Sequence, residues 1–246
     1  MHETKRFSMN GIWSFFAFPL NALCAILWFV SFAILRKKYP GSTVMRFLLS
    51  STATISSISL LILCCLWIGL TADRSFIGSL IFILILLYIQ TVLFLITLRG
   101  VRHADGSIRW RFIFLHAGLL LAVASTFWGS PDSNEFRMKI RCGETSREAY
   151  SLDSRKVQLE YEISLIDLNP VHYCADISID GHESATICVN SPYHVRFGED
   201  IYLASTSDDT CVLQIVREPW RYFTLAGVIL MLCGAFLLFI NGPRKR

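Results

Sequence analysis

The sequence predicts an α-helical membrane protein with about five transmembrane helices and an extracytoplasmic all-β domain inserted before the last helix. Two observations lead to this fold class. The chain of 246 residues is 53% hydrophobic and only 17% charged, which is too apolar for a soluble domain of this length. Its apolar residues gather in five long runs, whereas residues 129–221 are polar and alternate as strands do.

Each of the five apolar runs is long enough to cross a bilayer, which takes about 20 residues in a helix. We expect spans over residues 15–35, 47–70, 76–98, 112–128 and 222–240. The first four form a transmembrane region over residues 1–128, and the last forms residues 222–246 together with a basic cytoplasmic tail. Trp110, Trp128 and Trp220 flank the fourth and fifth spans, as interfacial anchors do.

Lysine and arginine are concentrated in three segments: the loop after the first span, the loop after the third span and the C-terminal tail. By the positive-inside rule these segments are cytoplasmic, and the amino terminus is then outside despite Lys5 and Arg6. Residues 129–221 carry a net charge of −7 and the rest of the chain +11. Basic charge on short loops indicates topology rather than nucleic-acid binding.

The segment 129–221 contains several short runs with strand periodicity. They are KVQLEYEISLIDL, VHYCADISID, SATICV, DIYLAST and TCVLQIV, and the second ends in the turn-like dipeptide DG. We expect five to seven strands in a small antiparallel sandwich or half-barrel. The sequence does not indicate the order in which these strands pair.

The eight cysteines divide evenly between the spans and the polar segment. Those in the spans are expected to behave as small hydrophobic residues; they are Cys24, Cys64, Cys65 and Cys233. The even number in the polar segment predicts two disulfides with three possible connectivities; the candidates are Cys142, Cys174, Cys188 and Cys211. A metal site is disfavoured because no pair has CxxC spacing and the nearby histidines stand singly; these are His172, His182 and His194.

The stretch RWRFIFLHAGLLLAVASTFW extends from Arg109 to Trp128, and after its two flanking arginines it contains one ionisable side chain, His116. Ionisable residues at membrane depth are rare and are read as functional by default. Two interpretations remain open: a ligand for a cofactor, or a neutral histidine hydrogen-bonded between helices. His103, in the loop VRHADGS, is expected to be solvated. No phosphate loop, Ser/His/Asp set or carboxylate pair is present, so the sequence predicts no catalysis by this chain alone.

Several stretches resemble the ResB/CcsB family, the membrane subunit of System II cytochrome c biogenesis, and in particular its Bacteroidetes-type branch. The resemblance rests on five segments in the family's order, and it covers most of the chain. They are SFFAFPLN, FLHAGLLLAVASTFWGS, FRMKIRCGE, VNSPYHVRFGEDIYLAS and LQIVREPWRYFTLAGVILMLCGAFLLF. The sequence departs from the family where Leu203 replaces the glutamine of Ile-Tyr-Gln, and where Glu218 replaces the usual aspartate before Pro-Trp.

The resemblance implies a role in exporting haem and presenting it, with a CcsA-type partner, for covalent attachment to apocytochrome c. His116 matches the family's membrane histidine, which implies an axial ligand to haem b that is held transiently and shared with the partner. The implied location is the bacterial inner membrane, in contact with lipid, with the β domain in the periplasm. The chain would be a subunit of a cytochrome c synthase and not a complete haem lyase.

Two alternatives come from other classes of function. A membrane-anchored structural or assembly subunit could share this architecture and bind no haem itself. A thiol-redox role for the outer cysteines would require a solvent-accessible pair that cycles with a reductant, whereas structural disulfides would be inert.

Overall fold

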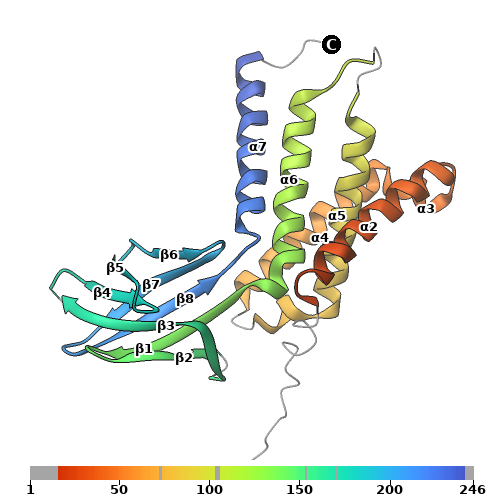
Figure 1. The fold of residues 1–246 in the computed structure, drawn as a ribbon. Helices are drawn as coiled ribbons and strands as arrows, with labels where there is room; N and C mark the ends of the chain where they lie inside the picture. The colour runs from red at the N-terminus through yellow and green to blue at the C-terminus, as the bar shows by residue number, and fades with distance from the viewer. Residues whose placement is uncertain (1–15, 72–73, 103–105, 153, 170, 242–246) are drawn as a thin grey trace, which may run out of the picture. The chain divides into compact units, whose positions relative to one another are not determined.

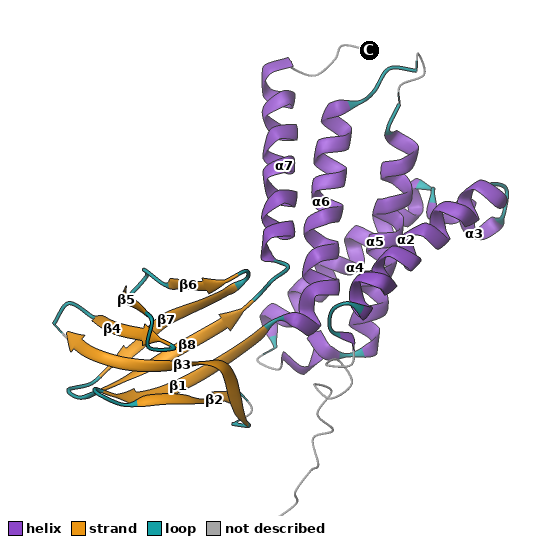
Figure 2. Cartoon of the chain, in the orientation of Figure 1, coloured by secondary structure: helices purple, strands orange, loops and turns teal. Residues whose placement is uncertain are grey.

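The computed structural model of the chain describes residues 16–71, 74–102, 106–152, 154–169 and 171–241. The chain divides into two compact units. The β unit is the segment Asp132–Trp220, and the helical unit consists of the residues before Asp132 together with those from Arg221 onward. Figure 1 follows the course of the chain, and Figure 2 distinguishes its helices from its strands.

Five helices in the described residues are long and apolar enough to cross a membrane, so the chain is a multi-pass membrane protein. The predicted fold class is confirmed in this respect. The five are α2 (Leu20–Lys38), α4 (Ser51–Leu70), α5 (Leu80–Gly100), α6 (Trp110–Gly129) and α7 (Arg221–Asn241). Three short elements accompany them: α3 (Thr43–Leu48), η2 (Arg74–Gly78) and η3 (Ser130–Asp132).

Serine caps set where the middle helices begin. The side chain of Ser50 accepts a hydrogen bond from the backbone N–H of Ala53, and that of Ser79 accepts one from Phe82, each at 3.2 Å. A capping serine satisfies a backbone donor that the first helical turn leaves unpaired. Helices α4 and α5 therefore start later than the predicted positions 47 and 76.

Helices α6 and α7 pack through small residues. A Cβ atom added to Gly227 would lie 2.6 Å from the carbonyl oxygen of Gly118, and one added to Gly118 would lie 2.6 Å from that of Gly227. The hydroxyls of Ser125 and Thr224 are 2.8 Å apart and hydrogen-bonded across the same interface. Close approach of two backbones at glycine, with a hydroxyl bond between them, is a usual way to hold membrane helices together.

Two long-range hydrogen bonds join the helix ends within the helical unit. The guanidinium of Arg99, at the end of α5, donates to the carbonyl oxygen of Leu49 beside the start of α4 at 3.1 Å. At the opposite end, the Asn21 amide at the start of α2 donates to the carbonyl oxygen of Trp128, near the end of α6, at 2.8 Å. The end of α5 and the start of α4 thus lie at one end of the helical unit, and the start of α2 and the end of α6 lie at the other.

The β unit is one antiparallel sheet of eight strands in the order β5-β4-β3-β2-β1-β8-β7-β6. The fold-class prediction of an all-β domain before the last helix is confirmed. The strands are β1 (Asn134–Arg141), β2 (Thr145–Ser151), β3 (Lys156–Asn169), β4 (Cys174–Ile179), β5 (Glu183–Cys188), β6 (Tyr193–Arg196), β7 (Glu199–Thr206) and β8 (Thr210–Arg217). The structure has more strands than the expected five to seven. Strand β2 is largely polar and β6 has only four residues, so neither gives a clear periodic pattern in the sequence.

The sheet curls around a core supplied by alternate residues of its strands. Burial alternates along all of β4 and along β8 as far as Val216, as expected for a sheet with one buried face. At the curled edges, the Tyr193 hydroxyl of β6 donates to the Glu183 carboxylate of β5 at 2.7 Å. Of the two predicted alternatives, a sandwich and a half-barrel, the arrangement is therefore the half-barrel. The fully buried large side chains include Met138, Ile140, Ile163, Leu165, Ile177, Ile187, Ile201, Leu213 and Ile215.

The buried carboxylate of Glu199, on β7, ties its strand to three others, β3, β6 and β8. Glu199 is 1% exposed and accepts hydrogen bonds from the hydroxyl of Tyr161 at 2.6 Å, from Nε of Arg196 at 2.8 Å and from Nε of Arg217 at 2.9 Å. Burial alone would raise the pKa of Glu199, but these three donors outweigh it and hold the pKa below its usual value.

Candidate functional site

His116 lies in the second turn of α6, and its ring is held by a local hydrogen bond. Its Nδ1 is 2.9 Å from the carbonyl oxygen of Phe112, one turn earlier. A carbonyl oxygen only accepts hydrogen bonds, so this contact requires a proton on Nδ1, and in the neutral ring the lone pair is then on Nε2. A backbone carbonyl bonded to the far ring nitrogen is the usual support of a histidine that ligates metal.

The orientation of the His116 ring is also fixed by stacking. The rings of His116 and Phe112 are stacked, with centroids 3.8 Å apart and planes inclined by 22°. The guanidinium of Arg109 lies over the Phe112 ring, 4.8 Å from its centroid. Phe112 in turn covers Gly100 so closely that any Cβ there would overlap its ring. The imidazole is therefore positioned before any ligand arrives.

His116 lies on a different face of α6 from Gly118. Gly118 lies against α7, and His116, two residues earlier, is about 200° around the helix from it. His116 is half-buried, and its Nε2 has no hydrogen-bond partner among the residues that the structure describes. His116 therefore lies on a face of α6 other than the one that Gly118 places against α7.

Within the described ranges, no three His, Cys, Asp or Glu side chains come together as a metal site would require. Among the described residues, His116 is therefore a single candidate ligand and not part of a ready-made cluster of metal ligands. Of the remaining histidines, His172 and His182 are exposed, and His194 has Nδ1 2.7 Å from Asp200. His103 lies outside the described residues.

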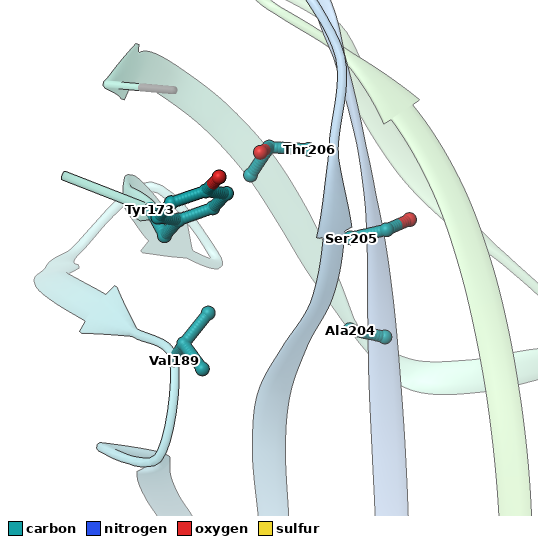
Figure 3. A pocket seen from close by; sticks show the side chains of 5 residues that line it. All are labelled: Tyr173, Val189, Ala204, Ser205 and Thr206. Atoms are coloured by element: carbon teal, nitrogen blue, oxygen red, sulfur yellow. The ribbon is translucent and has the colours of Figure 1, made fainter. Parts of the chain in front are cut away.

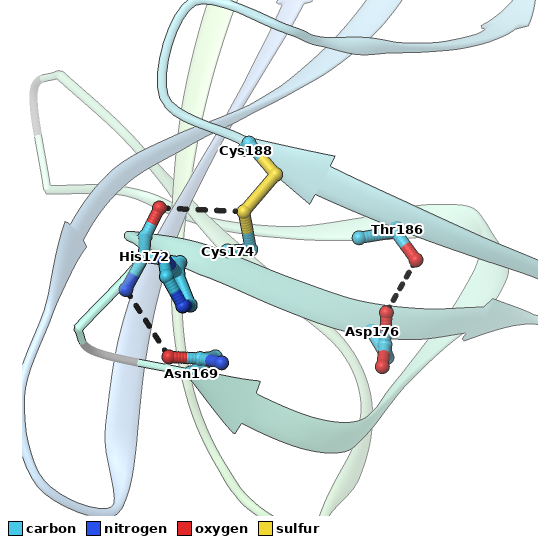
Figure 4. The surroundings of a disulfide bond; sticks show 6 residues. All are labelled: Asn169, His172, Cys174, Asp176, Thr186 and Cys188. Carbon is cyan, nitrogen blue, oxygen red and sulfur yellow. Dashed lines mark hydrogen bonds between the residues drawn. A yellow bond between two sulfur atoms is a disulfide. The ribbon is translucent and has the colours of Figure 1, made fainter.

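The outer cysteines form one disulfide, between Cys174 and Cys188. These residues are directly opposite each other in the β4–β5 ladder, so their side chains meet on one face (Figure 4). The expectation of two disulfides is corrected here: Cys142 and Cys211 are free thiols. In the β1–β8 register Cys211 is opposite Ile140 rather than Cys142, so the two sulfurs are diagonal neighbours and not a facing pair.

Cys211 also lacks the properties of a redox-active thiol. It is 1% exposed, and burial, with a smaller contribution from neighbouring Cys142, raises its pKa to about 11. The thiolate is the reactive form of cysteine, and it is scarce at neutral pH when the pKa is this high. The geometry supports a structural thiol at this position.

Replacing Cys174 with serine should destabilise the β unit by about 3 kcal/mol. The disulfide closes a loop with a sequence separation of 14, and restricting the unfolded chain over such a loop is worth about that much. Thermal unfolding of the full chain in detergent, followed by near-ultraviolet circular dichroism, measures the change. Cys142→Ser removes an exposed free thiol and is the matched control. Equal melting temperatures for the two variants would contradict the prediction.

The helical unit also contains buried polar contacts that sequence reasoning missed. Gln90 of α5 is completely buried, and its Oε1 accepts a hydrogen bond from the indole of Trp128 at 3.1 Å. The indole of Trp28 donates to the Thr91 hydroxyl at 3.0 Å. Trp128 was expected as an interfacial anchor, but its indole is bonded inside the unit. The available signal was Gln90 itself, a polar residue in the middle of an apolar run.

No family model and no curated protein matches this sequence. Among solved structures the chain is similar to a cytochrome c haem lyase, CcmF, with a TM-score of 0.38 and 13% sequence identity. The similarity covers 89% of this chain and 45% of that one. The chain therefore spans less than half the length of the protein it resembles.

Proposed function

We propose that this chain is a haem-handling membrane subunit of cytochrome c biogenesis, in which His116 provides one axial ligand to haem. The observation that supports this most is the hydrogen bond from Nδ1 of His116 to the Phe112 carbonyl. It leaves Nε2 as the basic nitrogen on a preoriented ring. Neutral imidazole is a common axial ligand of haem iron.

The proposed route of haem begins on the cytoplasmic side of a bacterial inner membrane. The clustered basic loops support a cytoplasmic position for the end of the helical unit where α6 starts. His116 is six residues from the first residue of α6, which places it about 9 Å along the helix axis from that end. A ligand at this depth could receive haem from the cytoplasmic side of the membrane. The β unit would then be periplasmic, where apocytochrome c is found.

A partner subunit is part of the proposal. This chain offers one axial ligand within its described residues, so a CcsA-type membrane partner would supply the second ligand and the attachment chemistry. Haem, the cargo, is the group that becomes covalently bound to apocytochrome c. The chain's own contribution is to bind and orient haem; catalysis by this chain alone is not proposed.

The test is restoration of cytochrome c maturation in a strain that lacks this gene. We expect the wild-type gene to restore haem-stained cytochrome c and His116→Ala to restore at least 10-fold less, because the iron loses a ligand. His172→Ala, in an exposed loop of the β unit, is the matched control and should act as wild type. Full restoration by His116→Ala, at equal protein abundance, would exclude the ligand role.

The alternative is a structural subunit of the same architecture that binds no haem. The close glycine packing of α6 and α7 is consistent with it, because such packing serves the assembly of membrane helices whether or not a ligand is bound. On that alternative His116→Ala would be silent, whereas disruption of the α6–α7 interface would abolish maturation. The haem-handling proposal requires both changes to be harmful.

A further inference from the structure

The β unit contains a pocket of about 400 Å³ at the seam between the two edges of its curled sheet. Tyr173 and Val189 line it beside β4 and β5, and Ala204, Ser205 and Thr206 of β7 line it from the other edge (Figure 3). Its volume falls in the range of about 300–1,000 Å³ that is usual for ligand pockets.

One wall of the pocket is rigid. Tyr173 and Val189 each adjoin a cysteine of the Cys174–Cys188 disulfide, and the N–H of Val189 donates to the Tyr173 carbonyl at 3.1 Å. Tyr173 has a φ of +51° and is 59% exposed. A bulky residue held with a positive φ while its ring faces solvent is unusual, and such positions concentrate at functional sites.

The opposite wall is an unpaired strand edge. Strand β6 pairs with β7 only from Glu199 to Ile201, whereas β7 continues to Thr206. Beyond Ile201, β8 is the one strand that pairs with β7 in the described part of the chain. Successive residues of a strand direct their N–H and C=O groups to alternate edges, so Ser205 or Thr206 presents a free donor and acceptor toward the seam.

Acidic residues follow the pocket strand β7 closely in the chain. Asp208 and Asp209 follow β7 in an exposed turn, and the segment 129–221 has a net charge of −7. A free strand edge is the structure that an extended polypeptide pairs with, and a neighbouring pocket selects one of its side chains. The acidic turn favours basic residues in that polypeptide.

We propose that this seam binds an extended, basic polypeptide segment, which pairs with the free edge of β7 and inserts one apolar side chain between Tyr173 and Thr206. The inference is independent of haem ligation. A His116→Ala chain should bind such a segment as wild type does, so failure of one proposal leaves the other intact.

The experiment measures fluorescence anisotropy of a labelled peptide, Lys-Val-Lys-Phe-Lys-Val, with the full chain in an uncharged detergent. We expect saturable binding that weakens at least 10-fold in Ala204→Phe, because the added ring fills the pocket. Leu152→Phe, at an exposed position outside the pocket, should bind as wild type. The same peptide with glutamate in place of lysine should also bind at least 10-fold more weakly.

A second probe does not depend on how any variant folds. Methylation of alternate backbone nitrogens preserves the peptide's side chains but removes the donors that strand pairing needs. Its affinity for wild type should fall at least 10-fold. Equal affinity of the methylated peptide, or no saturation of the parent peptide by about 1 mM, would overturn the proposal. A third outcome would also overturn the proposal: the chain binds no peptide but associates with itself, and Ala204→Phe abolishes this self-association. The seam would then be assigned to a second copy of the chain.

Discussion

Replacing Glu199 with alanine should destabilise the β unit by about 3–5 kcal/mol, the usual cost of removing one partner of a buried ion pair. The carboxylate accepts from Tyr161, Arg196 and Arg217. Its removal leaves a buried hydroxyl and two guanidinium groups without their shared acceptor. The urea midpoint of the β unit, measured by pulse proteolysis of the full chain in detergent, should fall accordingly.

The matched control for Glu199 is another glutamate on the same sheet. Glu135 is partly exposed, and its ion pair with Arg137 has an N–O distance of 3.5 Å, so Glu135→Ala should change stability by less than about 1 kcal/mol. If Glu199→Ala and Glu135→Ala shifted the urea midpoint equally, the buried cluster would not stabilise the fold as described.

The same cluster predicts how stability depends on pH. The pKa of Glu199 is lower in the folded chain than its ordinary value of 4.5. A carboxyl with a depressed folded pKa contributes stability above its unfolded pKa and loses that contribution as the pH falls through the folded value. The β unit should therefore lose stability progressively below about pH 4.5, and Glu199→Gln should show a weaker dependence on pH in that range.

Replacing Gly227 with leucine should disrupt the α6–α7 interface, at a cost of about 1–3 kcal/mol or more, because there is no space for a side chain. A Cβ at this position would meet backbone atoms, the Gly118 oxygen at 2.6 Å and the Ala122 nitrogen at 2.7 Å. Backbone atoms cannot swing aside as a side chain can. We expect a large loss of monodisperse protein after detergent extraction, measured by size-exclusion chromatography.

Gly69→Leu is the matched control in the helical unit. Gly69 lies in α4 and has nothing within 4 Å of a Cβ position, so leucine enters open space there. The yield of Gly69→Leu should equal that of wild type. Equal yields for Gly69→Leu and Gly227→Leu would contradict the packing described for α6 and α7.

The transmembrane helices could be predicted from sequence because a bilayer demands long apolar runs. Their starting residues could not, because Phe47 and Phe76 are as apolar as the helices that follow them. The caps Ser50 and Ser79 fix those starts instead. In the β unit, strand periodicity revealed β3, β4, β5, β7 and β8, but β6 has four residues and gives almost no periodic signal.

The candidate haem ligand was visible in the sequence because His116 is an ionisable residue in an apolar run. Its contact with Phe112 was also within reach, since that residue is one helical turn away. The pocket of the β unit that we propose to bind a peptide could not be predicted from the sequence. Tyr173, Val189 and Thr206 are distant in sequence, and strand pairing order alone decides that they meet. The disulfide likewise depends on a register that places Cys174 opposite Cys188.

The most direct test of haem ligation by His116 is the absorption spectrum of the protein purified in detergent after co-expression with a CcsA-type partner. Wild type should show a Soret band, and the band should weaken or shift in His116→Ala. Added imidazole should restore the wild-type band by supplying the missing nitrogen ligand. Identical spectra for wild type and His116→Ala, or no Soret band in either, would contradict a haem ligand at His116.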